Sequence, residues 1–311
     1  MKKSILMLLA LCSLNSSAQT KKITENQIAV NPLINGTLYI PENNSAKTKL
    51  VILIAGSGPT DRNGNQMGAV TNFAKNFAVA VAEGGNAVFA YDKRMFAQMK
   101  SGELKEETMR FEDGIKDVED IIIFFRAQKK YSKIIIAGHS EGSLIGMVAA
   151  QGKADAYISL AGVGNPADEI ILEQITKQAP MLKDEVEKNL AILKSGQTFT
   201  LENQMLASIF RESVQPYMIS WFKYNPQNEI KKLKIPVLLI NGTKDIQVDV
   251  RELDLLKVAK PDAQVAVIEN MNHLLREIKG DDTENIASYT DGNLPVMAPL
   301  ISIVNQFIKS I

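Results

Sequence analysis

Short apolar runs alternate with amphipathic stretches along most of this chain. The runs lack strict polar alternation, which is typical of parallel strands that are covered on both faces. Between them, apolar residues from Phe111 to Phe125 recur at steps of four and three residues, as on one face of a helix. The pattern predicts an α/β fold, a mostly parallel sheet flanked by helices. The expected strands are 50–55, 87–91, 133–137, 156–160, 235–240 and 263–268, with further candidates at 28–30 and 37–40.

The alternation stops between residues 165 and 228 and resumes at Ile235. In between, apolar residues follow helical spacing, and the segment ends in an aromatic cluster. The residues concerned are Leu182, Val186, Leu190, Leu201, Met205 and Ile209, followed by Tyr217, Trp221, Phe222 and Tyr224. We therefore expect a helical cap, 166–229, inserted into an α/β core formed by 19–165 and 230–311.

The first residues carry a different pattern. Lys2 and Lys3 precede a short apolar run, and Ala18 ends a small-residue cleavage signal. This predicts a secretory signal peptide, 1–18, because the apolar run is too short to span a bilayer. We expect a secreted or periplasmic protein without stable membrane insertion. Lipid anchoring at Cys12 is an alternative, although the preceding position holds leucine where a small residue is wanted.

Composition narrows the possible chemistry. The 311 residues contain 35 Lys and Arg against 35 Asp and Glu, so there is no basic excess to neutralise nucleic-acid phosphates. Cys12 is the single cysteine, and its removal with the signal peptide leaves no thiol for disulfides, zinc or nucleophilic catalysis. Only His139 and His273 are histidines, which excludes a multi-histidine metal site. We expect neither a metal nor another cofactor.

The sharpest chemical signal is Gly138-His139-Ser140-Glu141-Gly142. It follows a predicted strand directly and precedes a helical pattern, which is the strand–turn–helix setting of a nucleophile elbow. Glycines are needed there because the turn is so tight that side chains would collide with neighbouring backbone. Ser140 is therefore the candidate nucleophile.

A serine hydroxyl at its ordinary pKa needs a base. His139 belongs to the elbow itself, so His273, in the loop after the last predicted strand, is the candidate base. Asp245 follows the preceding strand and is the candidate acid that orients His273. Loops after parallel strands gather at one edge of a sheet, where these side chains can meet. The order Ser140, Asp245, His273 is also the chain order found in serine hydrolases that have a nucleophile elbow. The rival Asp249 is expected to cap the next helix instead.

An oxyanion hole needs two backbone N–H groups that converge on one point. Glu141 N–H follows the nucleophile, and we expect Ser57 N–H, in the loop after the first parallel strand, to be the second donor. That loop lacks the G-x-G-x-x-G pattern because Asp61 fills the third glycine position, so no dinucleotide site is predicted. A calcium loop beginning at Asp61 is rejected as well, because its required glycine and glutamate are missing.

Taken together, these motifs resemble those of α/β-hydrolases, and specifically of secreted bacterial esterases close to the serine aminopeptidase group. The resemblance covers nearly all of the chain after the signal peptide and implies the same triad. One difference is Met95, because relatives usually carry glycine there. Besides the elbow, the matching stretches are Gly56 to Asn65, Tyr91-Asp92-Lys93-Arg94 and Ile240 to Asp245.

The expected function is hydrolysis of small carboxylic esters through an acyl-enzyme. Ser140 attacks the carbonyl, His273 shuttles the proton and Asp245 orients His273. Two alternatives stay open: a serine peptidase of the aminopeptidase or prolyl type on the same triad, and a non-catalytic binding protein on this fold. The sequence specifies no oligomeric state. An apolar substrate pocket is expected from the cap residues Met181, Met205, Met218, Trp221 and Phe222.

Overall fold

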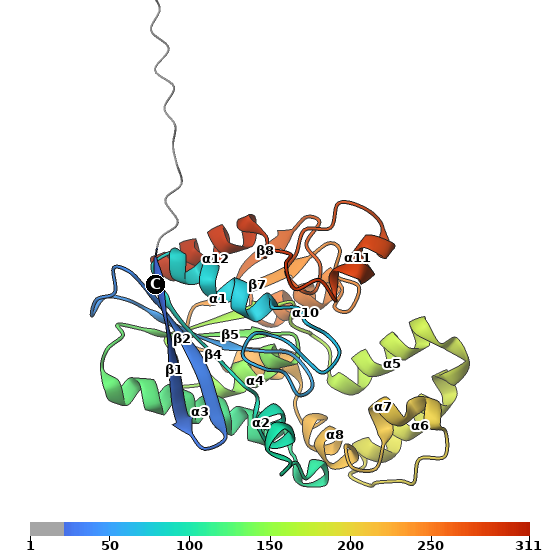
Figure 1. The fold of residues 1–311 in the computed structure, drawn as a ribbon. Coiled ribbons are helices and arrows are strands. Elements are labelled where there is room, and N and C mark those ends of the chain that lie inside the picture. Colours follow the sequence, from blue (N-terminus) through green and yellow to red (C-terminus); the bar gives the residue numbers. More distant parts are fainter. Residues whose placement is uncertain (1–21) are drawn as a thin grey trace, which may run out of the picture.

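The computed structural model describes residues 22–311, which form one sheet with helices on both faces (Figure 1). The predicted signal peptide, 1–18, lies outside the described residues, and so does Cys12. Among the helices described, none combines the length and the apolar character needed to cross a membrane.

The sheet has eight strands in the described part of the chain, in the order β1-β2-β4-β3-β5-β6-β7-β8. β2 pairs antiparallel with β1 and with β4, and the other neighbouring pairs are parallel. All six predicted core strands form, and the two N-terminal candidates become the antiparallel edge. The strands are β1 (Ile23–Asn31), β2 (Ile34–Pro41), β3 (Leu50–Ile54), β4 (Ala87–Tyr91), β5 (Ile134–His139), β6 (Ala156–Leu160), β7 (Val237–Gly242) and β8 (Gln264–Ile268).

Two layers of helices cover the sheet (Figure 1). On one face α3, α4, α9 and α10 bury their apolar sides, and on the other α1 and α12 do so. The sequence therefore predicted correctly a mostly parallel sheet flanked by helices. The helices outside the segment between β6 and β7 are α1 (Phe73–Glu83), α2 (Arg94–Ser101), α3 (Phe111–Gln128), α4 (Glu141–Ala149), α10 (Val250–Ala259), α11 (Asp282–Ser288) and α12 (Ala298–Ser310), with the 3₁₀ turn η1 (Glu106–Thr108).

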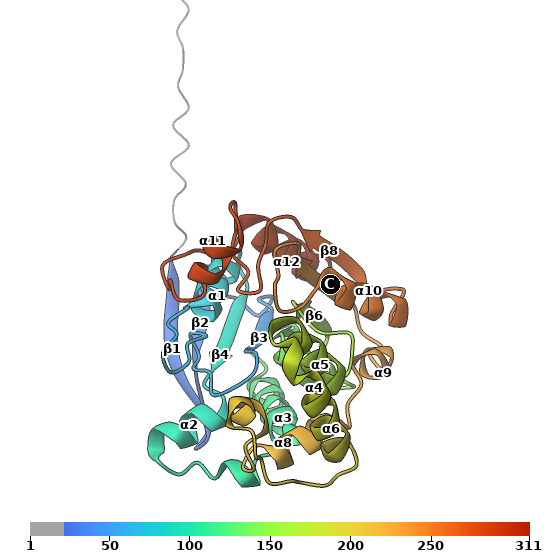
Figure 2. The same cartoon turned by 90° about the vertical axis from the view of Figure 1, so that its right-hand side faces the viewer.

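Only helical elements connect β6 to β7. Figure 1 shows α5, α6 and α7 standing out to one side of the sheet, and Figure 2 looks onto them from that side. Several helices of this segment bury a hydrophobic cluster of their own, which includes Ile175, Val186 and Phe210. The elements are α5 (Ala167–Gln178), η2 (Pro180–Leu182), α6 (Lys183–Lys194), η3 (Gln204–Leu206), α7 (Ala207–Phe210), α8 (Gln215–Trp221) and α9 (Pro226–Lys231).

Part of this segment departs from the sequence pattern. The spacing of Leu201, Met205 and Ile209 predicts one helical face, but the chain there forms only η3 and the single turn α7. The side chain of Asn203 accepts the N–H of Met205 and starts a new turn. Met205 is 72% exposed and Met181 is 79% exposed, so the expectation that both line a pocket is wrong.

The turn from β5 into α4 shows why glycine stands on both sides of Ser140. A Cβ on Gly138 would lie 2.2 Å from the carbonyl oxygen of Gly142. A Cβ on Gly142 would lie 2.5 Å from the carbonyl oxygen of Ala55, just beyond β3. Both contacts are with backbone atoms, which cannot rotate away as a side chain can. Gly138 therefore allows the tight turn itself, and Gly142 allows α4 to begin directly against the end of β3.

Replacing Gly142 with alanine is expected to lower the free energy of unfolding by about 1–3 kcal/mol, as overpacking does in a tight core. The matched control is Gly68→Ala, because nothing lies within 4 Å of a Cβ there and only its positive φ is strained. Urea unfolding of both variants measures the difference. A smaller loss in Gly142→Ala than in Gly68→Ala would show that the close approach is not required.

Candidate active site

Ser140 stands at the tip of the turn between β5 and α4. Its φ of +53° lies in a region that residues with a side chain rarely adopt. Two backbone hydrogen bonds hold the turn: Ser140 N–H donates to Leu160 O at 3.0 Å, and Ser143 N–H donates to Ser140 O at 2.9 Å. A strained turn of this kind exposes the serine hydroxyl above the edge of the sheet.

His273 and Asp245 come together at the same edge of the sheet. His273 Nδ1 lies 2.8 Å from Asp245 Oδ2, and the two side chains are 4% and 0% exposed. Asp245 Oδ1 accepts the N–H groups of Gln247 and Val248, each at 2.8 Å. Both carboxylate oxygens are thus engaged as acceptors, so Nδ1 of His273 donates and Nε2 is left for other chemistry.

Of the two hydrogen bonds expected within the predicted triad, the described residues form only the one between His273 and Asp245. Among the hydrogen bonds within residues 22–311, none links Ser140 Oγ to His273. The rival acid Asp249 caps α10 as expected, because its carboxylate accepts the N–H of Arg251 at 2.8 Å.

The loop that carries His273 is fixed by buried polar side chains. Asn272 is fully buried; its side chain accepts the N–H of Arg276 at 3.1 Å and donates to Ser288 Oγ at 2.8 Å. Arg276 is 1% exposed, and its guanidinium donates to the carbonyl oxygens of Thr71 and Ser288. Arg276 therefore ties the histidine loop to the loop between β3 and α1.

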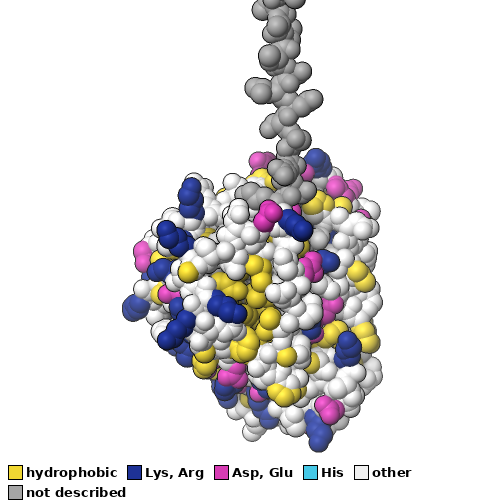
Figure 3. Space-filling view, turned by 60° about the vertical axis from the view of Figure 1, so that its left-hand side comes forward, with side chains coloured by type: hydrophobic (Ala, Val, Ile, Leu, Met, Phe, Trp, Pro, Cys, Tyr) yellow, Lys and Arg dark blue, Asp and Glu magenta, His cyan; other side chains and the backbone are white. Residues whose placement is uncertain are grey.

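His139 supports the backbone of His273. Its Nε2 donates to the carbonyl oxygen of His273 at 2.8 Å, and the two ring centroids are 4.7 Å apart. Both histidine residues are 3% exposed, and no histidine is visible on the face in Figure 3. Burial, helped by the nearby His273, lowers the pKa of His139 to about 3. His139 is therefore a neutral donor with a fixed tautomer.

The two expected oxyanion donors flank Ser140. Glu141 is the first residue of α4, so its N–H has no acceptor within the helix. A Cβ on Gly56 would lie 3.1 Å from Ser140 Cβ, which shows how closely the loop after β3 approaches the serine. Ser57 follows in this loop, and its N–H has no backbone acceptor among the described residues.

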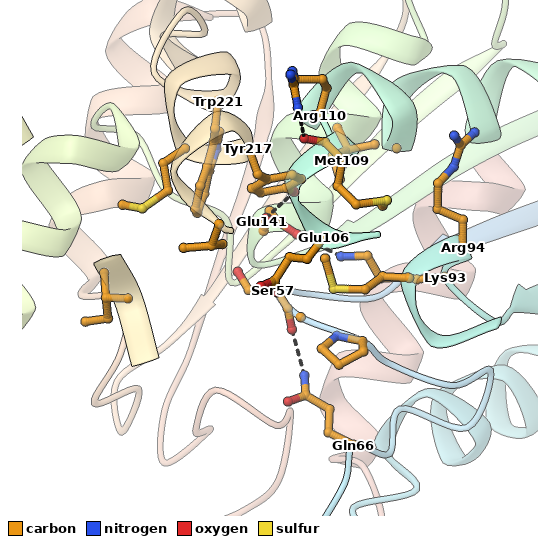
Figure 4. Close-up of a pocket in the computed structure, with 18 of the residues that line it drawn as sticks. Ser57, Gln66, Lys93, Arg94, Glu106, Met109, Arg110, Glu141, Tyr217 and Trp221 are labelled. Carbon is orange, nitrogen blue, oxygen red and sulfur yellow. Dashed lines mark hydrogen bonds and ion pairs between the residues drawn. The ribbon is translucent and has the colours of Figure 1, made fainter. Parts of the chain in front are cut away.

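A charged residue to which the sequence motifs gave no role contacts the segments that carry both donors (Figure 4). Lys93 follows β4, and its ammonium donates to Gly56 O and to Glu141 Oε2, each at 2.8 Å. The other oxygen of Glu141 accepts the hydroxyl of Tyr217, in α8, at 2.7 Å. The signal in the sequence was Asp92-Lys93-Arg94, three charged residues directly after a buried strand.

A cavity of about 610 Å³ opens beside these residues and reaches the elbow at Glu141. Met218 and Trp221 line it, as expected from the sequence, together with apolar side chains such as Met95 and Ile145. Phe222 is not among its lining residues and packs instead against the hydrophobic cluster of the helical segment. The prediction that Phe222 lines the pocket is therefore not met by this cavity.

Every carboxylate that lines the cavity has a cationic partner. Glu106 pairs with Arg211, Asp117 with Arg94 and Glu141 with Lys93. Hydrogen bonding to Arg211 lowers the pKa of Glu106 below its usual value, so this carboxylate stays ionised at neutral pH. Within the described part of the chain, no group of three or more His, Cys, Asp or Glu side chains is placed to hold a metal ion.

The depressed pKa of His139 predicts a loss of stability in acid. The unfolded chain binds a proton at His139 near pH 6.5, whereas the folded chain binds it only near pH 3. The free energy of unfolding should therefore fall as pH decreases through this window, with a slope from this residue that approaches about 1.4 kcal/mol per pH unit. His139→Gln should show a shallower decrease when urea unfolding is compared across this range; an equally steep one would contradict the assignment.

Known proteins from several organisms are similar to this chain. Esterase EstD of Thermotoga maritima is 27% identical in an alignment of length 275 that covers 83% of this chain; the chain spans only 62% of that relative's length. Est1E from Butyrivibrio proteoclasticus matches 92% of this chain and 99% of its own, with a TM-score of 0.58 at 16% identity. A Pyrococcus furiosus esterase matches 94% and 92%, with a TM-score of 0.53 at 14% identity.

The two structural matches establish the α/β-hydrolase fold. The sequence model of the BD-FAE family matches residues 37–259, which is well over half of the chain and extends from β2 to the end of α10. The chain belongs to the BD-FAE family.

Proposed function

We propose that this protein hydrolyses small carboxylic esters through an acyl-enzyme. The observation that carries the proposal is the strained elbow at Ser140 beside the buried pair His273–Asp245. A serine raised on such a turn is a nucleophile once a base takes its proton, and a histidine oriented by a carboxylate is that base. The similarity to Esterase EstD of Thermotoga maritima supports the same chemistry.

In the acylation half, Ser140 Oγ forms a bond to the ester carbonyl carbon while its proton passes to His273 Nε2. Asp245 holds the imidazole by Nδ1 and stabilises the imidazolium that forms. The negative carbonyl oxygen accepts hydrogen bonds from Ser57 N–H and Glu141 N–H. The C–O bond to the alcohol then breaks, and His273 returns the proton to the leaving oxygen.

In the deacylation half, water takes the place of the alcohol. His273 accepts a proton from the water as its oxygen bonds to the acyl carbon. The second tetrahedral intermediate collapses, the acid leaves, and Ser140 recovers its proton. In unliganded enzymes the serine–histidine hydrogen bond is often long and shortens only when substrate is bound.

The cavity favours an acyl group that is mainly apolar. Its volume of about 610 Å³ lies in the usual range for small-molecule sites. Its apolar side chains favour hydrocarbon, and its carboxylates Glu106, Asp117 and Glu141 are already neutralised by ion pairs. A peptidase that grips a free substrate amine needs an available carboxylate, so the cavity favours the ester over the peptidase alternative.

Replacing the proposed triad should abolish turnover of p-nitrophenyl esters. Ser140→Ala or His273→Ala is expected to lower kcat by about six orders of magnitude and Asp245→Asn by about four, by analogy with dissected serine hydrolases. Asp249→Asn is the matched control, because asparagine caps a helix about as well as aspartate. Near-normal turnover in Asp245→Asn together with a large loss in Asp249→Asn would reverse the acid assignment.

Shortening Trp221 should change acyl-chain preference. Trp221 lines the cavity and stacks on Phe111, with ring centroids 5.8 Å apart. Trp221→Ala enlarges the cavity, so the preference should move toward longer esters by about 1–3 kcal/mol per methylene of added room. A panel from acetate to palmitate measures the profile, and the thermal midpoint measures the cost in packing.

The matched control for this experiment is Phe222→Ala. Phe222 packs within the helical segment, so its loss should lower the thermal midpoint and leave the ester profile unchanged. If Trp221→Ala behaves in the same way as Phe222→Ala, Trp221 does not form the substrate pocket.

A further inference from the structure

The residues Asp92-Lys93-Arg94 take no part in the proposed reaction, yet each forms an ion pair with a different segment of the chain. Asp92 Oδ1 accepts Arg62 N–H at 2.8 Å and Arg62 Nε–H at 3.1 Å, which fixes the loop after β3. Arg94 pairs with Asp117 and binds α3. Lys93 lies between them and is directed at the elbow (Figure 4).

The ammonium of Lys93 fixes the direction of the Ser57 N–H. It donates to Gly56 O at 2.8 Å, and this carbonyl belongs to the same peptide unit as the Ser57 N–H. The described chain has no cis peptide bond, so the N–H points away from the carbonyl. Because Lys93 holds the Gly56 carbonyl oxygen on one side of the peptide unit, the Ser57 N–H points to the opposite side. The positive charge also polarises the amide, because hydrogen bonds in sequence strengthen one another.

The same ammonium holds the residue that carries the second donor. Lys93 Nζ donates to Glu141 Oε2 at 2.8 Å, and the side chains of Lys93 and Glu141 are 14% and 2% exposed. Tyr217 donates to Glu141 Oε1 at 2.7 Å and so fixes the carboxylate from the helical segment. Burial and the nearby carboxylate hold the pKa of Tyr217 well above its ordinary value, which keeps this hydroxyl a donor.

Stability alone is a poor reason for this arrangement. In a buried ion pair, the cost of removing both charges from water offsets most of their attraction. What the pair supplies is geometry, because one ammonium contacts the residue before Ser57 and the residue after Ser140.

We propose that Lys93 is a positioning residue for the oxyanion hole, which sets the Ser57 and Glu141 N–H groups for the tetrahedral oxyanion. The proposal rests on the proposed function. It assigns Lys93 no contact with the substrate or with the reacting atoms.

The test begins with Lys93→Met, which keeps the length of the side chain and removes its charge. We expect kcat for a p-nitrophenyl ester to fall about 100-fold, close to the loss of one oxyanion donor, with little change in KM. Lys93→Arg keeps the charge and should restore most of the lost kcat. The control is Lys116→Met, which removes an exposed ion pair with Asp120 on α3 and should leave kcat unchanged.

Two ketone inhibitors distinguish a specific effect of Lys93→Met on the oxyanion hole from a general loss of ligand binding. With a trifluoromethyl ketone, Ser140 Oγ bonds to the carbonyl carbon, its proton passes to His273, and the carbonyl oxygen becomes the oxyanion. Affinity for this compound should fall in Lys93→Met by the same factor as kcat/KM. Affinity for the methyl ketone of equal chain length, which binds without forming the oxyanion, should match that of the wild type.

Several results would overturn the proposal. Wild-type kcat in Lys93→Met, a loss confined to KM, or an equal loss of affinity for both ketones would each do so. If Lys93→Met fails to fold, as judged by its thermal midpoint, Glu141→Gln takes its place. This variant removes the charge partner, and an unchanged kcat in it would overturn the proposal as well.

Wild type and Ser140→Ala are measured beside these variants. Without Ser140-dependent hydrolysis in the wild type, both the proposed function and the role of Lys93 fail. With such hydrolysis and an unaffected Lys93→Met variant, only the role of Lys93 fails.

Discussion

The close approach of α4 to the end of β3 is the constraint on which the rest of the site depends. Because Gly142 has no side chain, α4 begins against the carbonyl oxygen of Ala55, and because Gly56 has none, the next loop reaches Ser140. Parallel pairing then does the remaining assembly, since every parallel strand ends at this edge. Lys93 follows β4, Asp245 follows β7 and His273 follows β8, so residues far apart in sequence arrive together without any long loop.

Much of this arrangement was predictable from the sequence, for simple physical reasons. Buried parallel strands are apolar on both faces, so each core strand is recognisable in the sequence as a short apolar run. The elbow requires two glycines at fixed offsets, which left Ser140 as the single candidate nucleophile. Asp245 and His273 were chosen by elimination and chain order, and the structure places their side chains in hydrogen-bond contact. The roles assigned to them, and to Ser57 and Glu141, stay predictions.

The remaining features depend on contacts that no local pattern encodes. Lys93 and Tyr217 meet Glu141 across sequence separations of 48 and 76 residues, and charged residues after a strand look like an ordinary solvated loop. Helical spacing identifies an apolar side chain but not what covers it, so Phe222 was placed in the pocket although it packs within the helical segment. The helix predicted around Met205 failed because the side chain of one asparagine competes locally for the backbone.

The contact between His139 and the His273 carbonyl oxygen determines whether the site could tolerate the loss of the His273 imidazole. His139 adjoins the nucleophile in sequence, but it cannot replace His273 as the base. Its Nε2–H is committed to a carbonyl oxygen, its Nδ1 is buried without a hydrogen-bond partner among the described residues, and protonation is disfavoured down to about pH 3. His139 therefore has a structural role, and the sequence holds no third histidine that could replace His273 as the base.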